Sequence, residues 1–183
     1  FNTLTGARQH VGNWPGVTVE KKEGLVTFGG FNFKVIDLPG IYSLTAYSLE
    51  EVVSRDFILK EHPDIVINIV DASNLERNLY LTAQILELGV PVIIALNMMD
   101  EAEKKGFEIK TPLLEKLLGV PVITTVASRG TGKNDLMEKT VAFLNGKVSI
   151  APRGIVYRKE IESALSHIQE TLETTFPEDF LDS

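Results

Sequence analysis

The sequence predicts an α/β fold with a doubly wound, mostly parallel sheet, an antiparallel hairpin at the edge of that sheet, and the start of a helical domain. Short apolar, β-branched runs alternate with helix-length amphipathic segments, which is the pattern of a parallel sheet flanked by helices. A Gly29-Gly30 pair joins two strand-like segments. The 183 residues are 44% hydrophobic and 23% charged, as in ordinary globular domains, which argues against disorder and coiled-coil rods.

The strands are predicted from period-two alternation and from short apolar runs. Residues 17–28 and 31–36 form the hairpin, with Gly29-Gly30 as its turn. The parallel strands follow at residues 65–70, 92–96 and 120–125.

The helices are predicted from capping residues and helical spacing. Residues 48–60 begin with Ser48 as N-cap and Glu51 three residues later, a capping box. The segment 75–88 ends at Gly89, and Thr111 is the expected cap of the next helix. The further helices are expected at 112–118, 134–145 and 155–174.

The chain divides into a domain over residues 1–146, a linker over 147–154, and the start of a helical domain over 155–183. Proline and glycine mark the linker. The last predicted helix carries apolar residues at helical spacing, so it needs a partner. It either docks on the α/β domain or begins a helical domain.

Charge and composition exclude several functions. The net charge of −7 disfavours a nucleic-acid surface, so no nucleic-acid partner is expected. The absence of cysteine excludes disulfides and thiolate metal sites. The apolar runs fall short of the roughly 20 residues that span a bilayer, and no signal peptide is recognised at the start. The histidines, His10, His62 and His167, are too far apart to suggest a transition-metal site.

An aspartate and a glycine follow the second hairpin strand, in the run Asp37-Leu38-Pro39-Gly40. In phosphate-handling α/β proteins such an aspartate holds Mg²⁺, and the glycine lets a backbone N–H approach the terminal phosphate. A plain turn explains the run equally well.

The loop over residues 12–20 offers a hydroxyl directly before a strand. Thr18 would complete the Mg²⁺ shell, as in a nucleotide-sensing switch loop. The metal ligands are therefore predicted to be Thr18 and Asp37, and catalytic roles fall to Thr18, Asp37 and Gly40. The nucleotide contacts predicted here are Gly16, Val17, Thr18, Val19, Glu20, Asp37, Leu38, Pro39 and Gly40.

The strand over 92–96 delivers Asn97-Met98-Met99-Asp100 to the carboxyl edge of the sheet, where ligands bind. The Asp100 carboxylate can accept both the ring N–H and the exocyclic amine of guanine, an arrangement that adenine does not offer. Asn97 would brace the loop and reach the base edge. The alternative is that Asp100 only caps a helix.

The next strand ends in a loop of small residues, in which Val126, Ala127 and Ser128 are predicted to let backbone N–H groups touch a planar base. A plain β-to-α turn explains this loop equally well.

These residues, in this order, resemble the GTP-binding domain of ferrous iron transport protein B. The stretches that carry the resemblance are residues 1–6, 11–20, 37–44 and 96–101. Met98 is typical of this family where most small GTPases have lysine, and Trp14-Pro15-Gly16-Val17-Thr18-Val19-Glu20 is more distinctive still. The resemblance covers residues 1 to about 146.

The resemblance implies a P-loop GTPase-like fold that binds GTP or GDP with Mg²⁺ and hydrolyses GTP to regulate ferrous iron passage. It also implies stimulation by K⁺, whose asparagine ligand lies in an upstream segment. The domain would lie on the cytoplasmic face of the cell membrane and act on membrane segments beyond Ser183. A homo-oligomer is left open.

The family's first motif, a Gly-rich phosphate loop ending in Gly-Lys-Ser/Thr, and the strand before it should precede Phe1. Residues 130–134 do not replace it, because Ala127 and Asn134 stand where a glycine and a hydroxyl are needed. We therefore expect upstream residues and an intact mass a few kilodaltons above 20.2 kDa.

Ile41 stands where many GTPases have the glutamine that orients the attacking water. Hydrolysis is therefore expected to be slow, and Ile41→Ala should leave the turnover rate within about an order of magnitude. A hundredfold loss with intact binding would refute this expectation.

Two other functions are compatible with parts of the sequence. A soluble GTPase of the ribosome-assembly kind should carry a basic RNA-binding module, which the −7 charge argues against. An interaction module without catalysis is the other alternative, if the phosphate loop is absent from the molecule.

Overall fold

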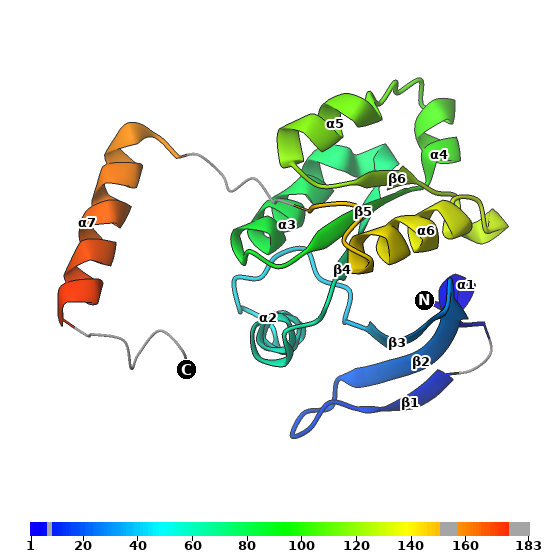
Figure 1. Ribbon diagram of the computed structural model, residues 1–183, viewed down its shortest axis with the longest axis horizontal. Helices are drawn as coiled ribbons and strands as arrows, with labels where there is room; N and C mark the ends of the chain where they lie inside the picture. The colour runs from blue at the N-terminus through cyan, green and yellow to red at the C-terminus, as the bar shows by residue number, and fades with distance from the viewer. Residues whose placement is uncertain (7–8, 151–156, 176–183) are drawn as a thin grey trace.

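The computed structural model describes residues 1–6, 9–150 and 157–175, and its strands form two three-stranded sheets (Figure 1). The antiparallel sheet has the order β1-β2-β3, and the parallel sheet has the order β4-β5-β6. The strands are β1 (Gln9–Asn13), β2 (Glu20–Phe28), β3 (Phe31–Asp37), β4 (Val66–Asp71), β5 (Val92–Asn97) and β6 (Val122–Thr124). The predicted α/β class is confirmed. The hairpin belongs to a separate antiparallel sheet, which no backbone pairing joins to the parallel one within the described residues.

The antiparallel sheet contains one strand that the sequence did not predict. Gln9–Asn13 pairs with β2 from Gln9↔Gly24 to Asn13↔Glu20. These residues include glycine and several polar side chains, so only their pairing with β2 identifies them as a strand. The predicted start of the hairpin at residue 17 is also wrong, because β2 begins at Glu20.

The turn of the hairpin has a direct conformational cause. Gly29 and Gly30 have φ values of 58° and 85°, in the left-handed region that a two-residue hairpin turn of type I′ requires. A Cβ atom on Gly29 would also lie 3.0 Å from a methyl group of Val141. Glycine at this position therefore serves both the turn and its packing against α6.

Helices cover both faces of the parallel sheet, as a doubly wound fold requires (Figure 1). On one face, Ile94 of β5 clusters with Leu86 and Leu114, and on the other face Ile93 clusters with Leu136. Val92, Ile93 and Ile94 are fully buried, so β5 is the centre of the core. The helices are α1 (Asn2–Thr5), α2 (Leu49–Glu61), η1 (Ala72–Asn74), α3 (Leu75–Glu87), α4 (Met99–Lys104), α5 (Thr111–Leu118), η2 (Ala127–Arg129), α6 (Lys133–Leu144) and α7 (Lys159–Thr175).

One helix start agrees with its predicted cap and one does not. The Ser48 side chain accepts a hydrogen bond from the Glu51 N–H, so Ser48 caps α2. The Glu51 carboxylate accepts from the Tyr47 N–H at 2.8 Å. Thr111 is the first residue of α5, and Lys110 is at the N-cap position without a side-chain bond, so the predicted Thr111 cap is wrong. Proline in the first turn suits this start.

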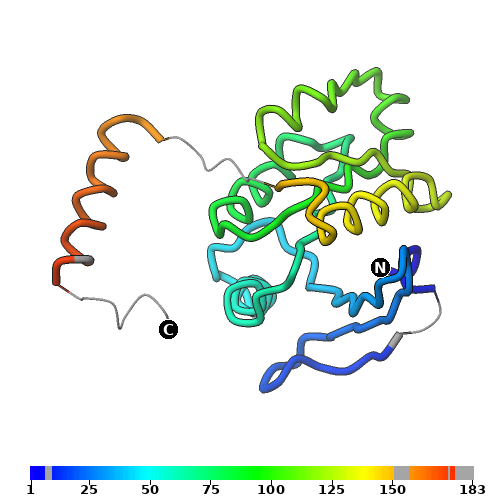
Figure 2. Tube along the Cα trace, in the orientation of Figure 1, coloured from blue at the N-terminus to red at the C-terminus, as the bar shows by residue number. Residues whose placement is uncertain are grey.

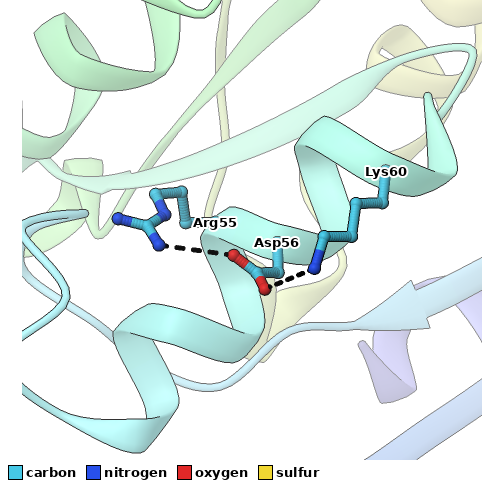
Figure 3. A network of polar contacts seen from close by, with 3 residues as sticks. All are labelled: Arg55, Asp56 and Lys60. Atoms are coloured by element: carbon cyan, nitrogen blue, oxygen red, sulfur yellow. Dashed lines mark hydrogen bonds and ion pairs between the residues drawn. The ribbon is translucent and has the colours of Figure 1, made fainter. Parts of the chain in front are cut away.

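The surface of α2 carries a small ionic network (Figure 3). Asp56 lies 3.4 Å from Arg55 and 2.9 Å from Lys60. All three side chains are at least one-third exposed. Since exposed ion pairs contribute about 0–1 kcal/mol, the network adds little to stability.

A buried polar pair ties α3 to the parallel sheet. The Asn68 amide donates to the Thr82 hydroxyl at 2.7 Å, and that hydroxyl donates to the Asn78 carbonyl at 3.1 Å. Thr82 is fully buried and Asn68 nearly so. Because buried polar groups cost free energy when unpaired, this pair fixes how α3 lies on β4.

The C-terminal helix α7 stands clear of both sheets (Figures 1 and 2). It begins at Lys159, and residues 151–156 and 176–183 of the predicted linker and helical domain lie outside the described residues. Its apolar side chains remain about half exposed, and they are Ile161, Leu165, Ile168 and Leu172. Just before α7, the Tyr157 hydroxyl donates to the Glu87 carboxylate at the end of α3.

Candidate nucleotide-binding site

The carboxyl ends of the parallel strands gather at one edge of the sheet. Asp71 of β4 lies beside Asn97 of β5 in the strand register, and Leu96 lies beside Thr124 of β6. Loops leave this edge toward η1, α4 and η2. In open α/β sheets this edge is where ligands bind.

Asn97 connects two of these loops. Its Oδ1 atom accepts hydrogen bonds from the Ala127 N–H at 2.9 Å and from the Thr125 hydroxyl at 3.3 Å. The structure therefore brings Asn97 and the small-residue loop of Val126, Ala127 and Ser128 together. Thr3 also donates to the Ala127 carbonyl at 3.2 Å, which joins α1 to the same loop.

Asp100 lies within the first turn of α4. Met98 occupies the N-cap position with a φ of 61°, and Met99 begins the helix. Asp100 is thus inside the helix and does not act as its N-cap, contrary to the alternative reading. Its side chain is 21% exposed, and Oδ2 lies 3.4 Å from Nη2 of Arg129. Met98 is 43% exposed.

A second group of predicted residues lines a pocket of about 300 Å³ at the end of β3. The lining residues are Val19, Glu20, Lys22, Asp37, Leu38, Pro39 and Gly40. Lys22 pairs with Glu20 at 2.8 Å and lies opposite Asp37 in the strand register. The hydrogen bond to Glu20, with a smaller contribution from Asp37, raises the pKa of Lys22 above its ordinary value.

The structure does not bring all the predicted switch-loop residues into this pocket. Thr18 is exposed and, with Gly16 and Val17, is not among its lining residues. Gly16 has a φ of 77°, as expected in a tight turn. The pocket thus holds Asp37 and Gly40 without the predicted hydroxyl ligand.

Trp14, directly after β1, is buried although it lies in the loop predicted over residues 12–20. It is only 8% exposed, and its ring meets Phe57 of α2 edge-on, with centroids 5.3 Å apart. The Lys21 ammonium lies 4.7 Å from the ring centroid. Among the residues that the structure describes, the buried indole N–H has no hydrogen-bond partner.

The segment after Gly40 is held by contacts that sequence reasoning missed. Tyr42 stacks against Arg77, at 3.8 Å from the guanidinium carbon to the ring centroid, and the Leu44 N–H donates to Gln84 at 2.8 Å. Glu51 accepts from Ser43 at 2.6 Å. Hydrogen bonds from Ser43, and then from the Tyr47 N–H, lower the pKa of Glu51. These contacts could not be predicted from local sequence, because they join a loop to side chains of α2 and α3 that are distant in the chain.

Sequence reasoning also missed the larger hollow, of about 570 Å³, between the start of α3 and the loop after α4. It is lined by residues 72–77 and 106–109. Asp71, just before these lining residues, accepts hydrogen bonds from the Ser73 N–H at 2.8 Å and from the Asn74 amide at 2.8 Å. The run Asp71-Ala72-Ser73-Asn74 directly after an apolar strand was the available signal.

The carboxylate available at this site could bind Mg²⁺ only if a phosphate group supplied further oxygen ligands. Within the described residues, no three His, Asp or Glu side chains form a group that could hold a metal ion. Asp37 supplies one carboxylate, and Mg²⁺ is commonly held by one or two carboxylates plus substrate phosphates. The residues present therefore suit a metal that arrives with a nucleotide. No helix in the described ranges is long and apolar enough to cross a bilayer.

The doubly wound sheet and its likeness to solved G domains define the class of the protein as a P-loop GTPase fold. The match to the family model described as ferrous iron transport protein B extends over residues 1–140. The chain belongs to this family, as an N-terminal G domain.

Relatives agree with this assignment. The chain is 47% identical over 174 residues to the Fe(2+) transport protein A/Fe(2+) transporter FeoB fusion protein of Porphyromonas gingivalis, covering 94% of this chain and 21% of that protein. It is 55% identical over 136 residues to Fe(2+) transporter FeoB of Shigella flexneri, covering 72% of this chain and 18% of that protein. The chain thus spans about a fifth of the length of these curated relatives.

A solved structure shares the fold at high similarity. The cytosolic domain of T. maritima FeoB in a GDP form has a TM-score of 0.89 and 42% identity, covering 94% of this chain and 68% of that one. The same domain in a GMPPNP form has a TM-score of 0.88, with the same identity and coverage.

Proposed function

We propose that this chain binds guanine nucleotides and slowly hydrolyses GTP to regulate ferrous iron transport. The observation that carries the proposal is the Asn97 bond to Ala127, which sets the small-residue loop beside Asp100 at the ligand-binding edge of the sheet. The T. maritima relative is described in GDP and GMPPNP forms, which supports the same ligand class here.

In this proposal the base is selected by Asp100. Its carboxylate accepts the ring N–H and the exocyclic amine of guanine, while Asn97 fixes the loop and reaches the base edge. The backbone of Val126, Ala127 and Ser128 lies against the plane of the base. Met98 and Met99 supply apolar contact from the start of α4.

The phosphate side is assigned to the pocket at the end of β3. Thr18 and Asp37 would hold Mg²⁺, which neutralises charge on the phosphates when bound. The Gly40 N–H would approach the γ-phosphate, with Gly16, Val17, Val19, Glu20, Leu38 and Pro39 lining the path. Thr18 has to move inward to reach this position, because it is exposed in the structure.

Slow hydrolysis is proposed from the residue after Gly40. Ile41 packs against the main hydrophobic cluster and has no group that could orient water. Backbone groups, or another side chain near Thr18, would take that role. K⁺ is proposed as an additional stimulating ion.

The regulated partner is proposed to be the transporter's own membrane part, with the domain on the cytoplasmic face of the membrane. The domain boundaries are proposed as 1–146 for the nucleotide-binding unit, 147–154 for the linker and 155–183 for the start of a helical regulatory unit. The loops around Trp14 and Tyr42 would transmit the nucleotide state, and a homo-oligomer is compatible with this arrangement.

The test is a change of base preference in Asp100→Asn. An amide in place of the carboxylate loses the acceptor for the guanine N–H groups and can donate to the 2-oxo group of xanthine. GDP affinity should fall by about 100-fold or more, while XDP affinity rises. Glu103→Gln, on the exposed side of the same helix, is the matched control and should bind GDP as the unmodified protein does. Unchanged GDP binding by Asp100→Asn would overturn the proposed site.

A further inference from the structure

The carboxylate assigned to the base already has a cationic neighbour. Arg129 is the last residue of η2, and its Nη2 atom lies 3.4 Å from Oδ2 of Asp100. The Arg129 side chain is 66% exposed and that of Asp100 is 21% exposed. The ion pair thus joins the exposed Arg129 side chain to the partly buried Asp100 carboxylate.

Among the described residues, this is the ion pair that Asp100 makes. The charge of Asp100 also acts on Lys104, but the Lys104 ammonium is bound to Glu101 at 2.7 Å. Lys104 is therefore held by another carboxylate, and Arg129 is the cation within ion-pair distance of the Asp100 oxygen.

The backbone of the loop that carries Arg129 is held in place by hydrogen bonds, whereas the exposed Arg129 side chain can move away from Asp100. The Ala127 N–H is held by Asn97, and the Val126 N–H donates to the Thr131 carbonyl at 3.2 Å. Gly132 closes the loop tightly, because a Cβ atom there would lie 2.2 Å from the Thr124 carbonyl. Release of Asp100 thus needs a side-chain rotation at Arg129 and no loop movement.

We propose that Arg129 competes with the guanine base for Asp100 and so sets how readily the site accepts a nucleotide. This inference rests on the proposed function of Asp100. A base that uses both carboxylate oxygens cannot approach in the carboxylate plane while a guanidinium holds Oδ2. Arg129 is thus a positioning residue that lowers the fraction of molecules competent to bind.

The expected effect is small but directional. An exposed ion pair shifts an equilibrium by about 1.5- to fivefold, and the apparent dissociation constant is inversely proportional to the competent fraction. Arg129→Gln should raise both the association rate and the affinity for GDP by that factor. The dissociation rate should not change, because Arg129 is displaced once the base is bound.

The experiment is stopped-flow binding of a fluorescent GDP analogue to the unmodified protein and to Arg129→Gln. Lys116→Gln is the charge-matched control, since Lys116 is exposed near the far end of α5. It should bind no faster than the unmodified protein. Loss of a positive charge weakens the long-range attraction of the nucleotide phosphates and so lowers GDP affinity. The gain in affinity expected for Arg129→Gln is opposite in direction, so it cannot come from the change in net charge.

A second experiment, in the Asp100→Asn variant, tests whether the effect of Arg129 depends on its pairing with Asp100. In Asp100→Asn, assayed with fluorescent XDP, position 100 has no charge for Arg129 to pair with, so adding Arg129→Gln should give no gain. A gain that persists there, or equal or weaker GDP binding by Arg129→Gln alone, overturns the inference. If GDP binds to neither the unmodified protein nor the variant, the proposed function itself fails, and the inference fails with it.

Discussion

Asn97 offers the sharpest test of how the candidate base site is built. Its Oδ1 atom accepts from the Ala127 N–H at 2.9 Å and from the Thr125 hydroxyl at 3.3 Å. Asn97→Ala removes both acceptors. At about 0.5–1.5 kcal/mol for each net hydrogen bond, the free energy of unfolding should fall by about 1–3 kcal/mol. For a domain of this size, that corresponds to a melting temperature lower by roughly 2–12 °C.

A second substitution at the same position separates bracing from base contact. Asn97→Asp keeps an oxygen that can accept both bonds but loses the amide donor and adds a charge near Asp100. It should retain most of the stability that Asn97→Ala loses, while GDP affinity falls by about 10- to 100-fold in both variants.

The assays are urea unfolding without nucleotide and calorimetric titration with GDP. An unfolding midpoint of Asn97→Ala equal to that of the unmodified protein would refute the bracing role. If Asn97→Asp is as destabilised as Asn97→Ala, the Oδ1 acceptor is not what holds the loop.

Three further predictions address the core, a loop and Trp14. Thr82→Val leaves the buried Asn68 amide without its acceptor and should lower the free energy of unfolding, measured in urea, by about 1–3 kcal/mol. The control Thr27→Val, at an exposed position, should change it by no more than about 0.5 kcal/mol. Equal unfolding midpoints for the two variants would contradict the reasoning. The pKa of Glu51 is lowered from its ordinary value of 4.5, so the ionised carboxylate stabilises the segment 43–47 at pH values above 4.5. This stabilisation is lost as the pH falls through the lowered pKa of the folded state. Glu51→Gln should therefore speed hydrogen exchange of the Tyr47 amide at neutral pH, and the difference should shrink as the pH falls below 4.5. The neighbouring Glu50→Gln should have no effect, and an unchanged Tyr47 rate in Glu51→Gln at neutral pH counts against the prediction. Trp14 is buried against Phe57, so its fluorescence should differ between GDP and a non-hydrolysable GTP analogue, and identical spectra would exclude movement of its loop.

Local features of the fold were predictable from the sequence. The Gly29-Gly30 turn follows from a backbone conformation that other residues rarely adopt. The Ser48 cap is equally local, because its partner is the N–H three residues later. The buried strand β5 is recognisable from its continuous apolar run.

The candidate site was predictable in its parts, since Asp37, Asn97 and Asp100 stand where apolar strands end. The sequence could not show which partners they have. Arg129 is 29 residues from Asp100 in the chain, and its proximity depends on how η2 follows β6 beside β5. Lys22 comes to lie opposite Asp37 only through the register of β2 and β3.

The sequence by itself determined the fold class, the family and the order of the candidate nucleotide contacts, because these depend on residue type and spacing along the chain. The tertiary structure decided that Gln9–Asn13 is a strand, that Trp14 is buried, and that Thr18 lies outside the pocket of Asp37. Each of these depends on the pairing and packing of segments distant in sequence, which local periodicity does not encode.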